Sequence, residues 1–136
     1  MKDMLGDLIY EGKGSITGFR VLDVEENKIE YSLIEDGKFK DIDVVITSTF
    51  WTIPAGKDIV YGEAQAIITA KARRETVTYR GCGLGHLSKQ GKTSFRGTNF
   101  YKTSSNGKVS FLNNMVGAFE AEAYENHHSG KVWEWK

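Results

Sequence analysis

The sequence predicts an all-β fold, an up-and-down barrel of about eight antiparallel strands. Three observations lead to this prediction. No long stretch places apolar residues at the i, i+3, i+4, i+7 spacing of an amphipathic helix. Segments rich in β-branched and aromatic residues follow one another across short turns. The chain has fifteen glycines and one proline, and glycines within strand-like segments are typical of sheets that bend. Consecutive strands joined by short turns close most simply as a barrel, with a two-sheet sandwich as the alternative.

Turn signals divide the chain into the expected strands. A tight turn at Glu26–Lys28 ends the first segment, and Asp36-Gly37, a strong hairpin signal, ends the second. The longest loop is expected at Trp51–Asp58, around Pro54, and any helix is expected to be short and to lie there. Polar and glycine-containing turns separate the later segments. The eight expected strands are Leu8–Glu25, Ile29–Ile34, Phe39–Phe50, Ile59–Ala72, Glu75–Ser88, Thr93–Thr103, Val109–Tyr124 and Lys131–Lys136.

The fourth segment has a rival interpretation, because its alanines would also suit a helix. β-Branched neighbours and a strict alternation of small residues favour a strand. Since successive strand side chains point to opposite faces, this alternation also assigns the inner face of each segment. Nine glycines then lie on the inner face: Gly12, Gly14, Gly18, Gly62, Gly81, Gly83, Gly85, Gly97 and Gly117. They either let the strands coil tightly under aromatic side chains or clear a lumen for a small ligand.

The same alternation gives a set of candidate ligand-binding residues. Aromatic walls with a few amides and hydroxyls are typical of small-molecule pockets, although such groups can also satisfy one another in a packed core. The expected inward set is Arg20, Tyr79, Asn99, Tyr101, Asn113, Met115, Trp133 and Trp135.

Three other groups of residues could carry chemistry, but none of them predicts a catalytic residue, a metal site or a cofactor. Cys82 and His86 share a face, but four strand residues span roughly 13 Å, too far for a hydrogen bond. The adjacent pair His127-His128 lacks a third ligand at a suitable spacing and is interpreted as a solvated turn. The Gly-Lys-Thr sequence ending at Thr93 has the wrong glycine spacing for a phosphate-binding loop.

Composition limits the possible partners and locations. Eighteen basic and eighteen acidic residues cancel, so no global charge favours nucleic acid or an anionic membrane. Apolar runs are far shorter than the roughly 20 residues that span a bilayer, and Met1–Tyr10 lacks the apolar block of a signal peptide. We therefore expect a single cytoplasmic domain covering residues 1–136, without nucleic-acid or membrane partners.

The glycine-rich meander and its late element Gly117-Ala118-Phe119-Glu120-Ala121-Glu122-Ala123-Tyr124 resemble the allene oxide cyclase and dirigent barrels. Those families have lipocalin-like, eight-stranded barrels with a Gly-x-Phe element late in the chain. None of their catalytic residues aligns with this sequence. The resemblance implies a lumen for a hydrophobic small molecule, no cofactor, and often an oligomer.

Three functional hypotheses follow. The first is a barrel that binds a hydrophobic small molecule. The alternatives are a cofactor-free isomerase or cyclase acting in a similar lumen, and a structural, self-assembling barrel. An enzyme needs an inward titratable group, and the inferred inner face offers tyrosines, Arg20 and almost no carboxylates, which favours binding. A homo-oligomer is expected because little net charge opposes association and Leu84, Phe100, Leu112 and Val116 are expected to face outward.

Overall fold

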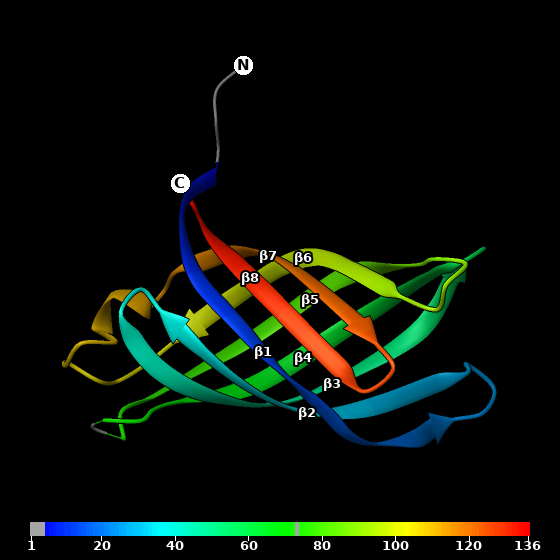
Figure 1. Ribbon diagram of the computed structural model, residues 1–136, viewed down its shortest axis with the longest axis horizontal. Helices are drawn as coiled ribbons and strands as arrows, with labels where there is room; N and C mark the ends of the chain where they lie inside the picture. Colours follow the sequence, from blue (N-terminus) through cyan, green and yellow to red (C-terminus); the bar gives the residue numbers. More distant parts are fainter. Residues whose placement is uncertain (1–4, 73) are drawn as a thin grey trace.

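The computed structural model is a closed antiparallel barrel of eight strands (Figure 1). Each strand pairs with the next, and β8 pairs with β1, which closes the barrel and removes the exposed sheet edges. The predicted up-and-down barrel is therefore confirmed, and the sandwich alternative is wrong. The strands are β1 (Leu5–Asp23), β2 (Lys28–Phe39), β3 (Ile42–Gly56), β4 (Ile59–Ala70), β5 (Thr76–Leu87), β6 (Thr93–Lys102), β7 (Val116–Tyr124) and β8 (His127–Trp135).

The structure describes residues 5–72 and 74–136. The first four residues of the segment Met1–Tyr10, in which no signal peptide is expected, lie outside the described residues. Within the described ranges, the structure contains no helix that is both long enough and apolar enough to cross a membrane.

Several strand boundaries differ from the sequence prediction: β8 begins at His127 and not at Lys131, and three differences, in β2, β3 and β7, are larger. β2 continues through Asp36-Gly37, and the chain turns instead at Lys40 and Asp41, where Lys40 has a φ of 56°. β3 continues through Pro54 to Gly56, so the expected long loop at Trp51–Asp58 is mostly strand. The register explains both differences, because strand pairing with β1 and β4 extends through these segments and outweighs their local turn preference.

The third difference lies before β7. Instead of one strand from Val109 to Tyr124, a connection follows β6 and contains the 3₁₀ helix η1 (Ser110–Leu112). Leu112 was expected to face outward, but its side chain is fully buried. This connection places Val109, Leu112 and Met115 in the apolar core and so covers one end of the barrel.

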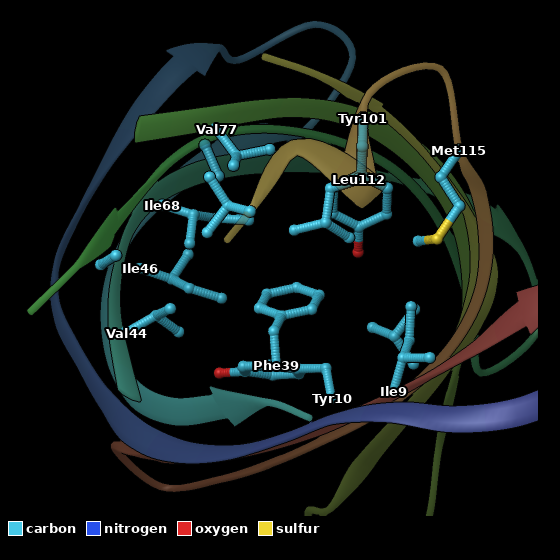
Figure 2. Close-up of a cluster of buried hydrophobic side chains, with 14 residues drawn as sticks. Ile9, Tyr10, Phe39, Val44, Ile46, Ile68, Val77, Tyr101, Leu112 and Met115 are labelled. Atoms are coloured by element: carbon cyan, nitrogen blue, oxygen red, sulfur yellow. The ribbon is translucent and has the colours of Figure 1, made fainter. Parts of the chain in front are cut away.

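The core fills that covered end. Figure 2 shows the Phe39 ring near the middle of the cluster, with Ile46 and Ile68 on one side and Ile9 and Met115 on the other. The rings of Phe39 and Tyr101 meet edge to face, with centroids 5.9 Å apart. The rest of the lumen is lined by aromatic and polar side chains together with small residues.

Candidate functional site

A cavity of about 90 Å³ occupies the half of the lumen beyond the core. A single buried water needs at least about 10–15 Å³, so the cavity can hold more than one water. It is smaller than drug-sized pockets of roughly 300–1,000 Å³, and a ligand of about one ring suits it. Small residues such as Gly62, Ala64 and Ala121 line it, together with the aromatic rings of Phe50 and Phe95.

A polar cluster interrupts this apolar wall. The Tyr10 hydroxyl donates a hydrogen bond to Oε1 of Glu35 over 2.6 Å. Nδ1 of His128 lies 2.7 Å from Oε2 of the same carboxylate. The Glu35 residue is only 4% exposed, and the His128 side chain is 10% exposed. Both carboxylate oxygens of this buried glutamate on β2 are therefore hydrogen-bonded, by one group from β1 and one from β8.

Barrel closure and a glycine bring this cluster together. In the sheet, Gly14 of β1 pairs with Glu35 of β2 on one side and with His128 of β8 on the other. Cross-strand partners share a face, so both side chains point into the lumen across the bare backbone of Gly14. A β-carbon at Gly14 would lie 2.6 Å from the α-carbon of Glu35, which leaves no room for a side chain there.

Two further glycines accommodate the same groups. A β-carbon at Gly37 would lie 2.6 Å from the Tyr10 ring, so this ring rests on bare backbone. A β-carbon at Gly130 would meet the Glu35 carboxylate oxygens at 3.5 and 3.7 Å, an ordinary contact distance. The glycines around the cluster therefore allow close strand packing and leave space for inward polar side chains of the protein itself.

The hydrogen-bond geometry of the cluster, with the raised pKa of Tyr10, assigns a role to each of its groups. Burial, and then the charge of Glu35, raise the pKa of Tyr10 well above its ordinary value, so the phenol keeps its proton. An ionised carboxylate only accepts hydrogen bonds. When Glu35 is ionised, its partner Nδ1 of His128 is the protonated nitrogen, and Nε2 of a neutral imidazole carries a free lone pair. Among the described residues, the structure gives Nε2 no hydrogen-bond partner.

Side chains that can donate hydrogen bonds lie on a different part of the cavity wall. Nδ2 of Asn99 donates to the Tyr101 hydroxyl over 3.2 Å, and the rings of Tyr79 and Tyr101 are 5.4 Å apart. Burial, with the charge of Glu35 as the next cause, raises the pKa of Tyr79 to about 12. Burial likewise raises the pKa of Tyr101. Both phenols remain protonated at neutral pH and line the cavity, so they can donate to an oxygen of a bound molecule.

The structure brings together three of the eight residues predicted to bind a ligand. Tyr79, Asn99 and Tyr101 line the cavity. Met115 is buried, but it packs in the core at the covered end.

The other four predicted positions were assigned to the wrong side of the barrel or to the wrong element. Arg20 lies on an exposed part of β1, and its Nε donates to Oε1 of Glu30 over 3.0 Å. Asn113 is exposed after η1, and its Oδ1 accepts from the Thr103 backbone N–H. Trp133 and Trp135 alternate with the inward Val132 and therefore face outward.

The register of β8 explains the error at the tryptophans and also reveals His128. The turn at Glu125 and Asn126 pairs Ala123 with His128 and Phe119 with Val132. The inner face of β7 was predicted correctly, and tight hairpins carry a face from one strand to the next. Because His127-His128 was interpreted as a solvated turn, the inner face of β7 was not extended across the hairpin into β8. The face of β8 was instead assigned from its two tryptophans, and large apolar side chains alone do not determine which face of a strand points inward.

Glu35 was missed for a related reason. The Asp36-Gly37 hairpin signal ended the predicted second strand before Glu35 was assigned to a face. In the structure, Leu33, Glu35 and Phe39 alternate along the buried face of β2. The apolar residues at positions 33 and 39 were the signal that could have placed Glu35 inside. The inference that the inner face offers almost no carboxylates therefore missed the one at Glu35, which is buried in the lumen.

In the described ranges, no group of three or more His, Cys, Asp or Glu side chains is arranged to hold a metal ion. Cys82 is a free, exposed thiol on the outer side of β5.

Comparisons with known proteins support the fold. No protein family model matches the sequence, and no curated protein sequence matches it. A solved structure of a protein of unknown function from Clostridium acetobutylicum has a TM-score of 0.82, with 8% identity over 100% of this chain and 99% of that chain.

Two more solved structures have the same architecture. A β-barrel-like protein from Acinetobacter baumannii has a TM-score of 0.79, with 12% identity over 97% of this chain and 95% of that one. A conserved protein of unknown function from Rhodopseudomonas palustris has a TM-score of 0.78, with 10% identity over 98% and 99%. These similarities show a shared barrel fold and establish no link to allene oxide cyclases or dirigent proteins. The chain is thus similar over nearly its whole length to bacterial barrel proteins of unknown function.

Proposed function

We propose that this protein binds a small molecule that has a mostly apolar body of about one ring and a single oxygen acceptor. The observation that carries the proposal is the open cavity in which an apolar wall meets a few buried polar groups. Pockets for small molecules combine these two features. The phenols of Tyr79 and Tyr101 would donate to the acceptor, and Phe50 and Phe95 would contact the apolar body.

The polar groups are already arranged before a ligand enters. Glu35 is held by two hydrogen bonds, and Asn99 is held against Tyr101. In the described part of the chain, no buried side-chain nitrogen or oxygen lacks a hydrogen-bond partner. Preorganised side chains lower the entropic cost of binding, which supports a binding site rather than an accidental gap in the packing.

Nuclear magnetic resonance titration with cyclohexanone, phenol and benzene tests the proposal. We expect cyclohexanone and phenol to shift the methyl resonances of Ala64 and Ala121, which line the cavity. Benzene should bind more weakly, because a hydrogen bond contributes about 0.5–1.5 kcal/mol, which corresponds to up to about tenfold in affinity.

A pair of variants on β7 locates the binding. Ala121→Leu adds apolar volume inside the cavity and should abolish the titration. Ala118→Leu lies on the opposite face of the same strand and should leave it unchanged. Thermal unfolding checks that both variants fold. Equal binding by Ala121→Leu and the wild type, or no shift with any of the three compounds at millimolar concentration, contradicts the proposal.

A further inference from the structure

We propose that His128, oriented by Glu35, is a general base that removes a proton from the carbon next to the carbonyl of a small ketone bound in the cavity. This inference rests on the proposed binding function and adds a reaction to it. It also revives the isomerase hypothesis, which the expected scarcity of inward carboxylates had disfavoured.

The first step is the orientation of the imidazole. The 2.7 Å contact between Nδ1 and the Glu35 carboxylate holds the proton on Nδ1 and leaves Nε2 as the basic nitrogen. A carboxylate on one imidazole nitrogen fixes the tautomer and stabilises the imidazolium that forms when the other nitrogen takes a proton. Tyr10 donates to the second carboxylate oxygen, so the carboxylate is held from both sides.

The second step is the surroundings of the base. His128 lines the cavity, and its ring lies 6.4 Å from that of Phe50, measured between centroids. Glu63, Cys82, Glu120 and Lys131 also border the cavity, but these residues alternate with its inward residues and their side chains belong to the outer face. The inward titratable groups that line the cavity are therefore Tyr10, Glu35, Tyr79, Tyr101 and His128. Only His128 among them presents an unoccupied basic nitrogen.

The third step is the stabilisation of negative charge. Removing a proton next to a carbonyl moves an electron pair onto the carbonyl oxygen, and donors fixed near this oxygen stabilise the resulting enolate. The phenols of Tyr79 and Tyr101 are protonated donors on the cavity wall. Asn99 holds the Tyr101 oxygen as an acceptor, which leaves the phenolic hydrogen of Tyr101 available.

The reaction balances without any other reactant. The C–H bond breaks, its proton goes to Nε2, and its electron pair forms the enolate. The imidazolium then returns the proton to the same carbon, or to the γ-carbon of an unsaturated ketone. The first outcome exchanges a hydrogen and the second moves a double bond. Small enolisable carbonyl compounds are therefore the inferred substrate class.

The test uses exchange of the α-hydrogens of cyclohexanone in deuterium oxide, followed by proton nuclear magnetic resonance. We expect the wild type to accelerate exchange above the buffer rate. General acid–base catalysis contributes typically 10²- to 10⁴-fold, so His128→Gln should lose at least tenfold of this acceleration. The adjacent, exposed His127 gives the matched control, and His127→Gln should exchange cyclohexanone at the wild-type rate.

Glu35→Gln tests the positioning role. It should lower the exchange rate at saturating cyclohexanone while the dissociation constant stays within about twofold. The ¹⁵N resonances of His128 should also change from the Nδ1–H pattern to a mixture of tautomers, a change that a purely structural role of Glu35 would not produce. Thermal unfolding of each variant checks the fold, and added imidazole should restore exchange in a His128→Gly variant.

The outcomes separate the two proposals. Cyclohexanone that binds in the titration but exchanges at the buffer rate, or exchanges equally fast in His128→Gln, overturns the catalytic inference and leaves binding intact. Absence of binding overturns both. Binding together with exchange that requires His128 and not His127 supports both.

Discussion

Two glycines that the sequence assigned to the inner face give a quantitative prediction about close strand packing, because Gly97 and Gly18 differ in their surroundings. The register irregularity between Ile16 and Gly18 pairs Gly18 with Ser32, which alternates with the inward Leu33, so the inner-face assignment of Gly18 is wrong. Gly97 of β6 faces Gly83 of β5, and a β-carbon at Gly97 would lie 2.7 Å from the Gly83 α-carbon and 2.8 Å from the Phe119 ring. Gly18 of β1 has open space, with nothing within 4 Å of such a β-carbon. Neither glycine has a left-handed backbone conformation.

The magnitude follows from two opposing effects. Glycine within a strand costs about 0.5–1 kcal/mol relative to alanine, so Gly18→Ala should stabilise the fold by about that amount. Gly97→Ala gains the same backbone contribution but overpacks the interior, which costs typically about 1–3 kcal/mol. The difference between the two variants cancels the backbone contribution, so Gly97→Ala should be less stable than Gly18→Ala by about 1–3 kcal/mol.

Urea denaturation of both variants, analysed with equal m-values, measures this difference. A thermal midpoint lower by about 4–12 °C for Gly97→Ala should accompany it, at about 4 °C for each kcal/mol in a chain of this size. If the two variants differ by less than about 0.3 kcal/mol, the reasoning is refuted. Gly97 would then only clear space in the lumen, and its substitution would impair binding without affecting stability.

Four other predictions follow from the structure. Glu35→Leu removes the acceptor of both the Tyr10 hydroxyl and the His128 N–H, and each unsatisfied buried group costs about 1–3 kcal/mol; urea denaturation should therefore show a loss of about 2–6 kcal/mol. The pKa of Tyr79 is raised from 10.0 to about 12, so the associated stability is complete below pH 10 and is lost as the pH rises through 12. The share of Tyr79 in this loss is about 3 kcal/mol, and the raised pKa values of Tyr10 and Tyr101 add to it in the same direction. Urea denaturation from pH 9 to 12.5 should therefore show a loss of at least about 3 kcal/mol, and constant stability over this range would contradict it. The indoles lie on the outer face, so saturating cyclohexanone should leave tryptophan emission unchanged, and a marked shift in its maximum would place the ligand elsewhere. Self-association remains a prediction, supported by the exposure of Phe100 (55%); light scattering should report more than one copy for the wild type and fewer for Phe100→Lys, and a wild-type mass of about 15 kDa would contradict it.

The amino-acid sequence by itself determined the fold class and much of the inner face. Alternating small and large residues on β4, β5 and β6 correctly placed Tyr79, Asn99 and Tyr101 in the lumen, because strand periodicity is local and needs no knowledge of neighbours. The same reasoning failed on β2 and β8. On β2, the Asp36-Gly37 hairpin signal ended the predicted strand too early. On β8, the two tryptophans were assigned to the inner face although the register turns them outward.

Only the tertiary structure decided the polar cluster. Glu35 and His128 are 93 positions apart in the chain and lie on β2 and β8, which are separated by β1 in the closed sheet. Closure between β1 and β8 sets the row in which Gly14 lies between them. A one-residue slip of either strand would turn its side chain outward. This pairing depends on register summed over the whole barrel, which no local pattern in the sequence specifies.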